Sequence, residues 1–115
     1  MIRILVYGAK GTMGKIITNE IESHPDFILS ACVSKHIDGD ESCSAFADLD
    51  SVNVEYDVVI DFSHFSLTDD LIDFCIKKNK PLVLATTGLS EEQEQKVLKA
   101  SDTIPVFRSK NLSIG

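Results

Sequence analysis

Three glycines near the start of the chain, Gly8, Gly11 and Gly14, have the residue type and spacing best suited to binding a ligand. A glycine at the end of a strand permits a tight turn, and one within the turn lets an anion approach the backbone because no Cβ intervenes. With a strand before these glycines and a helix after them, the N–H groups of residues 12–14 and the positive end of the helix dipole would face the anion. The spacing therefore predicts a site for a diphosphate group.

The spacing G-x-x-G-x-x-G differs from the G-x-G-x-x-G of many dinucleotide-binding turns, so the surrounding pattern has to support the assignment. A nucleoside-triphosphate loop is excluded. Ile16 follows Lys15 where a metal-binding Ser or Thr is required, and Ala9 stands in place of the first glycine. The turn therefore favours a dinucleotide, and the alternative is a glycine-rich turn that binds no ligand.

The tip of the second predicted strand carries Ser34 and Lys35 instead of the carboxylate that usually binds the ribose hydroxyls of NAD. A carboxylate would repel a 2′-phosphate, whereas a hydroxyl and an ammonium group can bind it. We therefore expect NADPH to bind at least as well as NADH, with help from Lys35 and from Lys10 in the glycine turn. The alternative is that Lys35 is a solvated cation in a loop.

These residues depend on strands that bring them together. Apolar, β-rich segments predict five strands, at residues 2–7, 27–33, 57–61, 81–85 and 104–107. Between the second and third of them, residues 34–56 are irregular and acidic, and we expect only one short helical turn there, around residues 45–49.

Helices are predicted between most of these strands. One follows the glycines and stops near Pro25. Capping-box patterns at residues 66–69 and 90–93 predict two more. The first of these would carry Leu67, Leu71, Phe74 and Cys75 on one face and end at Lys77 and Lys78, and the second would include Val97 and Leu98.

Strands that alternate with helices predict right-handed crossovers and a parallel sheet. The expected fold class is α/β, a Rossmann-like doubly wound parallel sheet with helices on both faces. Residues 1–115 would form one dinucleotide-binding domain. The sequence ends directly after a predicted strand, and we expect it to be one domain of a longer protein.

The composition is that of one ordinary soluble domain, with 115 residues of which 43% are hydrophobic and 25% charged. No apolar run approaches the ~20 residues of a membrane helix, and the apolar start is too short for a signal peptide, so a cytoplasmic protein is expected. The net charge of −7 argues against a nucleic-acid surface. Cys32 and Cys75 are interpreted as small buried hydrophobic residues rather than redox or metal ligands.

No catalytic or metal-binding residue is predicted. The histidines His24, His36 and His64 show neither metal-ligand spacing nor a partnered nucleophile. Asp61 is expected to anchor a loop through hydrogen bonds rather than to act as a base.

Four sequence motifs together resemble the dihydrodipicolinate reductases (4-hydroxy-tetrahydrodipicolinate reductases) of bacterial lysine and diaminopimelate biosynthesis. They are Val-Tyr-Gly-Ala-Lys-Gly-Thr-Met-Gly at 6–14, Val-Ile-Asp-Phe-Ser at 59–63, Ala-Thr-Thr-Gly-Leu at 85–89 and Asn-Leu-Ser-Ile-Gly at 111–115. They occur in the expected order and cover the whole chain.

The resemblance implies an oxidoreductase in which NADPH or NADH reduces a cyclic unsaturated imine dicarboxylate to tetrahydrodipicolinate. It also implies that the substrate-binding and oligomerisation domain, which carries the proton-donating segment, is absent from this chain. The fragment would then be inactive, the intact enzyme a homotetramer, and its partner a small-molecule substrate rather than nucleic acid or membrane.

The resemblance also assigns the cofactor site. The glycine turn would bind the pyrophosphate, and residues 34–35 would contact the adenosine ribose. Residues 62–63 would line the crevice. Residues 85–87 would lie beside the nicotinamide, and residues 109–112 would close over it. The candidate cofactor-binding residues are Gly8, Ala9, Lys10, Gly11, Thr12, Met13, Ser34, Lys35, Phe62, Ser63, Ala85, Thr86, Thr87, Ser109, Lys110, Asn111 and Leu112.

Two residues depart from the family pattern, namely Ala85, where a glycine is common, and Ser34, where dual-cofactor members have an acid. Two other functions remain open. The first is a different NAD(P)-dependent dehydrogenase, of the homoserine or aspartate dehydrogenase kind. The second is a non-catalytic module that binds a nucleotide or a CoA-type ligand.

Overall fold

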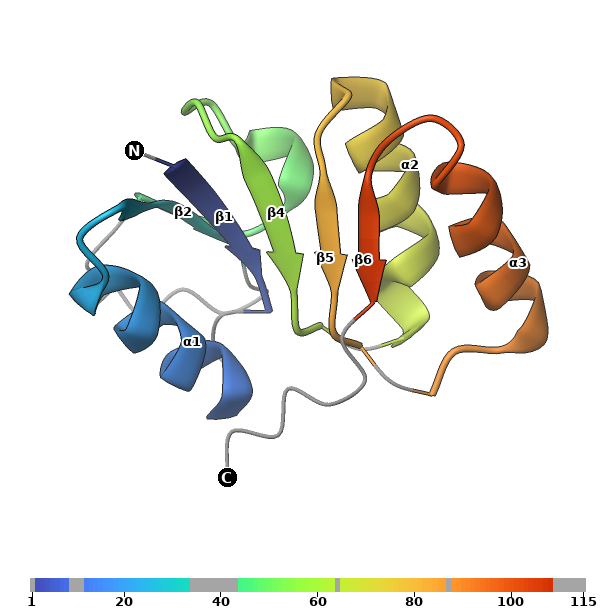
Figure 1. Cartoon of the computed structure of the whole chain (residues 1–115), viewed down its shortest axis with the longest axis horizontal. Helices are drawn as coiled ribbons and strands as arrows, with labels where there is room; N and C mark the ends of the chain where they lie inside the picture. The colour runs from blue at the N-terminus through green and yellow to red at the C-terminus, as the bar shows by residue number, and fades with distance from the viewer. Residues whose placement is uncertain (1, 9–11, 34–43, 64, 87, 109–115) are drawn as a thin grey trace.

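The computed structural model describes residues 2–8, 12–33, 44–63, 65–86 and 88–108. Within them the chain forms a six-stranded sheet, in which every neighbouring pair of strands is parallel and the order is β3-β2-β1-β4-β5-β6 (Figure 1). The strands are β1 (Ile2–Tyr7), β2 (Phe27–Val33), β3 (Ser44–Phe46), β4 (Val58–Asp61), β5 (Leu82–Leu84) and β6 (Val106–Arg108). The expected fold class is confirmed.

The segment expected to be irregular contains a strand, so this part of the prediction is wrong. β3 has three residues, and Ala45 lies opposite Cys32 of β2. A strand this short has no measurable periodicity, and its pairing partner is what defines it. The helical turn expected around residues 45–49 is instead a 3-10 helix at Leu49–Ser51, where the Asp48 carboxylate accepts a 2.8 Å hydrogen bond from the Ser51 N–H.

Three α-helices connect the strands, α1 (Thr12–Ser23), α2 (Thr68–Lys78) and α3 (Glu91–Ala100). The capping box predicted for α3 is confirmed, because the Gln93 N–H donates to Ser90 Oγ at 3.2 Å and the Ser90 N–H donates to Gln93 Oε1 at 2.9 Å. The Gln93 amide also donates to the Phe65 carbonyl at 2.7 Å. This contact joins the start of α3 to the segment that precedes α2.

The capping box predicted at residues 66–69 is wrong. A 3-10 helix (Phe65–Leu67) comes first, and α2 has Leu67 as its N-cap, with no side-chain capping bond. Leu67 already has right-handed helical dihedrals, whereas a capping Ser or Thr requires an extended backbone. The predicted end of α2 at Lys77 and Lys78 is confirmed, and Asn79 follows it with a left-handed φ of 56°.

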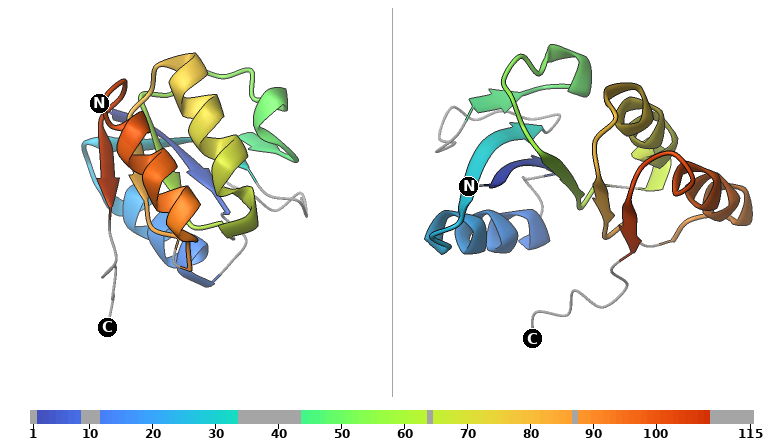
Figure 2. Two further views of the ribbon diagram at one scale, coloured as in Figure 1. Left: turned by 90° about the vertical axis from the view of Figure 1, so that its right-hand side faces the viewer. Right: turned by 45° about the horizontal axis from the view of Figure 1, so that its top comes forward.

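The helices cover both faces of the sheet (Figure 2). Ile21 of α1 belongs to a cluster with Ile4 and Val6 on one face. A larger cluster lies on the other face, where α2 and α3 pack, and it includes Leu5 and Leu82. Alternate residues of β1 therefore serve opposite cores, as expected for a strand covered on both sides.

Helix α3 contains Val97 and Leu98, as predicted. Val97 is buried whereas Leu98 is 62% exposed, because neighbouring helical positions differ by about 100° in direction. Cys75 is buried as expected, whereas Cys32 is buried but disulfide-bonded.

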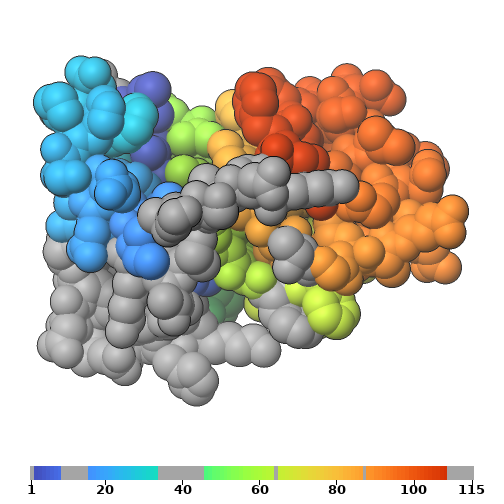
Figure 3. Space-filling model, turned by 60° about the horizontal axis from the view of Figure 1, so that its bottom comes forward, coloured from blue at the N-terminus to red at the C-terminus, as the bar shows by residue number. Residues whose placement is uncertain are grey.

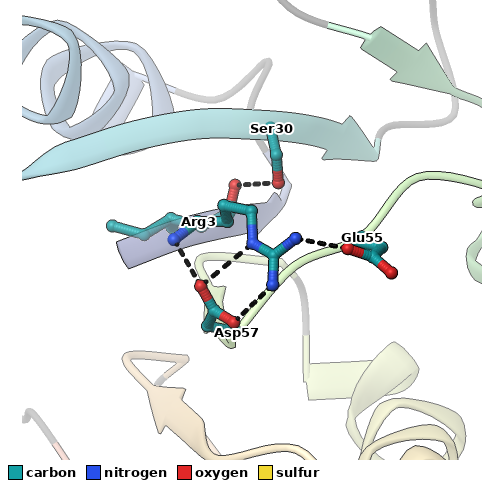
Figure 4. Close-up of polar contacts among 5 residues, drawn as sticks. Arg3, Ser30, Glu55 and Asp57 are labelled. Atoms are coloured by element: carbon teal, nitrogen blue, oxygen red, sulfur yellow. Dashed lines mark hydrogen bonds and ion pairs between the residues drawn. The ribbon is translucent and has the colours of Figure 1, made fainter. Parts of the chain in front are cut away.

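An ion pair fixes the amino-terminal ends of β1 and β4 (Figure 4). The Arg3 guanidinium donates to both carboxylate oxygens of Asp57, at 3.2 and 3.0 Å, and to Glu55 at 2.5 Å. The backbones of Arg3 and Asp57 also bond, since the Asp57 N–H donates to the Arg3 carbonyl at 2.7 Å. This cluster lies at the edge of the sheet opposite to the carboxyl ends of the strands.

The Arg3 contact lowers the pKa of Asp57 from 3.8 to about 2. Because this pKa is depressed on folding, the ion pair stabilises the protein fully above about pH 4 and less as the pH falls toward 2. We expect Asp57→Asn to lower the free energy of unfolding at pH 6, and we expect the difference from the parent to shrink between pH 4 and pH 2. Urea unfolding at several pH values measures this, and a difference that is constant with pH contradicts it.

Among the residues that the structure describes, no helix is both long enough and apolar enough to span a membrane.

Candidate functional site

The candidate site lies at the carboxyl ends of the strands, which is the edge that Figure 3 brings forward. Backbone hydrogen bonds hold the ends of neighbouring strands level with one another. They run from Gly8 N to Val33 O (2.8 Å), from Phe62 N to Tyr7 O (2.8 Å) and from Ala85 N to Asp61 O (3.0 Å). The carboxyl ends of β1, β2, β4 and β5 therefore lie at one edge of the sheet, where ligands bind in open α/β sheets.

Gly8 has a conformation and surroundings that only glycine tolerates. Its φ is +86°, and a Cβ built on it would lie 2.7 Å from the carbonyl carbon of Phe62 and from the nitrogen of Ser63. The sequence predicted the tight exit from β1, and the structure adds the close approach of the backbone after β4. The backbone of Gly8 therefore lies directly against that of residues 62–63.

Helix α1 presents a different amino terminus from the other two α-helices. Its first turn holds no acidic residue, whereas α2 has Asp69 and Asp70 there and the first turn of α3 has three glutamates. Carboxylates near a helix amino terminus interact favourably with the helix dipole. Helix α1 carries none in its first turn, directly after the glycine turn, so no carboxylate of that turn interacts with its positive end.

Asp61 ends β4 and is fully buried. Its Oδ1 accepts hydrogen bonds from the N–H and the hydroxyl of Ser63, at 2.9 and 2.5 Å, and its Oδ2 lies 2.5 Å from Thr86 Oγ1. Burial raises the pKa of Asp61, and the hydrogen bonds from Ser63 and Thr86 oppose that rise. The expectation that Asp61 anchors a loop through hydrogen bonds is confirmed.

Thr86 connects this loop to the next strand. Its hydroxyl lies 2.9 Å from the Ser63 carbonyl as well as 2.5 Å from Asp61, and its side chain is buried. Sequence analysis placed Thr86 beside the cofactor but missed its contact with Asp61. The two residues are 25 positions apart, and only the register of β4 against β5 brings them together.

Arg108, at the end of β6, is a residue of this edge that the sequence analysis did not single out. Its guanidinium pairs with Glu94 of α3. This ion pair fixes the last described residue of the chain to a helix. Lone charged residues at strand ends carry no sequence pattern that predicts such a pairing.

Of the predicted site residues, the structure brings together Gly8, Phe62, Ser63, Ala85 and Thr86 at this edge. The backbones of Thr12 and Met13 begin α1. Outside the described residues lie Ala9, Lys10, Gly11, Ser34, Lys35, Thr87, Ser109, Lys110, Asn111 and Leu112. In the described part of the chain, no group of three or more His, Cys, Asp or Glu side chains is placed to hold a metal ion.

The strand order, with a glycine turn and a helix amino terminus after the first strand, defines a Rossmann-like α/β domain. A family model described as dihydrodipicolinate reductase, N-terminus, matches residues 2–112. The chain belongs to this family.

Curated relatives support the assignment. The 4-hydroxy-tetrahydrodipicolinate reductases of Caldanaerobacter subterraneus subsp. tengcongensis and Clostridium tetani are each 41% identical to this chain over 115 residues. The match covers all of this chain and 45% of each relative, so the chain spans about half their length. The homoserine or aspartate dehydrogenase alternative is therefore not favoured.

A solved structure matches the fold. It is the dipicolinate-bound dihydrodipicolinate reductase from Paenisporosarcina sp. TG-14, which aligns with a TM-score of 0.83 and 23% sequence identity. The alignment covers 99% of this chain and 49% of that one.

Proposed function

We propose that this chain is the NAD(P)H-binding domain of a 4-hydroxy-tetrahydrodipicolinate reductase in lysine and diaminopimelate biosynthesis. The observation that carries the proposal is the amino terminus of α1, which follows the glycine turn at the end of β1 and has no carboxylate in its first turn. Backbone N–H groups and a helix dipole in this arrangement suit a diphosphate. Membership of the reductase family supports the nicotinamide dinucleotide over a CoA-type ligand.

The residues at the carboxyl edge fit this cofactor. The N–H groups of residues 12–14 would bind the pyrophosphate, and the absence of a Cβ at Gly8 lets residues 62–63 pack against the turn. Ala85 is small enough for main-chain groups to reach a flat carboxamide, and Thr86 would lie beside it. When bound, the reduced cofactor supplies a hydride, and the role of this domain is to hold and orient it.

The remaining steps belong to the longer protein in this proposal. The substrate, a small cyclic dicarboxylate, would bind to a second domain that also carries the proton donor and forms a cytoplasmic homotetramer. No residue of the present chain is assigned a catalytic role. We therefore propose that the chain alone binds the cofactor without turnover.

Selectivity between the two cofactors would depend on residues 34–35, which follow β2 directly. Val33 ends β2, and its carbonyl accepts the Gly8 N–H, so this strand end lies beside the glycine turn. We propose that Ser34 and Lys35, with Lys10, bind the 2′-phosphate of NADPH, which makes NADPH the favoured cofactor.

Calorimetric titration of the chain with NADPH, NADH and CoA tests the proposal. We expect binding of NADPH, equal or weaker binding of NADH, and none of CoA. Lys35→Ala should lower the affinity for NADPH by about tenfold, or ~1.4 kcal/mol, and should leave the affinity for NADH unchanged, because only NADPH carries the 2′-phosphate.

Lys78→Ala is the matched control, because it removes an equal charge at the carboxyl end of α2. It should leave both affinities unchanged. A chain that binds neither nicotinamide cofactor contradicts the proposed function. A preference for NADH that Lys35→Ala does not change contradicts only the selectivity.

A further inference from the structure

The buried carboxyl group of Asp61 has no cationic partner among the described residues. The pKa of Asp61 is raised by burial, and the opposing influences are hydrogen bonds from Ser63 and Thr86. Among the described residues, the titratable groups that interact with it from the neighbouring elements are Tyr7 of β1 and Cys75 of α2, and both are neutral near pH 7. Burial raises the pKa of the Cys75 thiol to about 12, and the pKa of Tyr7 is also raised.

The positions of hydrogen atoms around Asp61 give an independent argument. The Thr86 hydroxyl has one proton, but two oxygens lie within hydrogen-bond distance of it, Asp61 Oδ2 at 2.5 Å and the Ser63 carbonyl at 2.9 Å. If Asp61 is ionised, both neighbours are acceptors and they compete for that proton. If Asp61 carries a proton on Oδ2, it donates to Thr86, and Thr86 donates to Ser63.

The other carboxyl oxygen agrees with this arrangement. Asp61 Oδ1 faces two donors, the N–H and the hydroxyl of Ser63, and therefore needs no proton of its own. A chain of hydrogen bonds then runs from Asp61 through Thr86 to the Ser63 carbonyl, with one donor and one acceptor at every contact. Buried polar groups that are fully satisfied in this way rigidify the segments they join.

We propose that Asp61 is a neutral carboxylic acid in the folded protein and a positioning residue for the cofactor. It joins the segment after β4, where Ser63 lies, to the segment after β5, where Thr86 lies. The cofactor part of this inference rests on the proposed function. The phosphates of the dinucleotide are negative, and a carboxylate buried at the carboxyl edge of the sheet would repel them. A neutral carboxylic acid at this position avoids that repulsion.

The protonation state can be measured without any cofactor. In a protein labelled with carboxyl-¹³C aspartate, we expect the Asp61 signal at pH 7 to have the chemical shift of a protonated acid. Asp57 directly precedes β4, the strand that Asp61 ends, and serves as an internal reference. Its signal should be that of a carboxylate, because Arg3 lowers the pKa of Asp57 to about 2. An Asp61 signal at the carboxylate position at pH 7 overturns the proposal.

Two variants test the positioning role. Asp61→Asn has the shape of the neutral acid, and its NH₂ group can donate to Thr86 while its oxygen accepts from Ser63. We expect it to bind NADPH within about threefold of the parent, whereas Asp61→Ala should bind at least about tenfold more weakly because Ser63 and Thr86 lose their buried partner. An Asp61→Asn variant as weak as Asp61→Ala overturns the proposal.

The pH dependence of stability gives a second readout. Because the pKa of Asp61 is raised on folding, its proton is held more tightly in the folded state, and the free energy of unfolding should fall as the pH rises from about 4 through the folded-state pKa. Asp61→Asn should lack this component, and an identical pH profile for parent and variant contradicts the inference. If the chain binds no nicotinamide cofactor but Asp61 is protonated, the proposed function and the positioning role that rests on it fail, whereas the neutral state of Asp61 stands.

Discussion

Gly8→Ala is expected to destabilise the domain by about 3 kcal/mol or more, which is a large part of the stability of a domain of this size. Two effects add. A non-glycine residue at a φ of +86° is strained, and the new Cβ would lie 2.7 Å from backbone atoms of both Phe62 and Ser63. Backbone atoms cannot rotate away as a side chain can, so the segment after β4 must move. Urea unfolding followed by circular dichroism measures the change.

Gly88→Ala is the matched control. Gly88 has a similar φ of +79°, but the nearest atom that a Cβ there would meet among the described residues belongs to the Phe65 ring, at 3.6 Å, which is an ordinary contact. We expect a loss of about 1 kcal/mol from backbone strain alone. Equal losses for the two variants would show that the close approach at Gly8 contributes nothing. Gly8→Ala should also weaken NADPH binding by the folded molecules, because it displaces residues 62–63 from the turn.

The sequence predicts the frame of this site well because each part of it is local. The glycine turn, the strand before it and the helix after it are contiguous, so residue type and spacing specify them together. The capping box at Ser90 is equally local, since the two side chains that form it are three residues apart. In the described residues the structure reproduces the strand that ends at Tyr7, directly before Gly8, the helix that begins at Thr12 and the capping box.

The sequence does not predict features that depend on contacts between distant segments, because its patterns are local. β3 is defined by its pairing with β2, and the contact between Asp61 and Thr86 depends on the register of β4 against β5. The capping-box pattern at Ser66 failed because residues 65–67 are already helical, so the helix begins later than its local pattern indicates. Sequence patterns cannot rank local preferences against tertiary contacts.

The three helix amino termini show how the local and distant features combine. Helices α2 and α3 carry carboxylates in their first turns, and α1 carries none. This difference is visible in the sequence once the helix starts are known. The structure then adds that the end of β1 lies against the backbone after β4, so that the amino terminus of α1 and residues 62–63 border one edge.

Stability and cofactor binding should be separable in this domain, and Leu82→Ala is the variant that separates them. Leu82 is fully buried at the amino-terminal end of β5, where its N–H donates to the Pro105 carbonyl at 2.9 Å. Removing its side chain leaves a cavity in the core shared with α2 and α3, and we expect a loss of about 2–5 kcal/mol in the free energy of unfolding.

Leu98→Ala deletes the same atoms from an exposed position of α3 and should change the stability by less than about 0.5 kcal/mol. Leu82 lies at the edge of the sheet opposite to the candidate site, so folded Leu82→Ala molecules should bind NADPH as the parent does. Gly8→Ala is expected to lose both stability and affinity because it acts at the carboxyl edge itself. If Leu82→Ala, measured where it is fully folded, loses affinity as Gly8→Ala does, then the core and the site are coupled and the cofactor contacts are not confined to that edge.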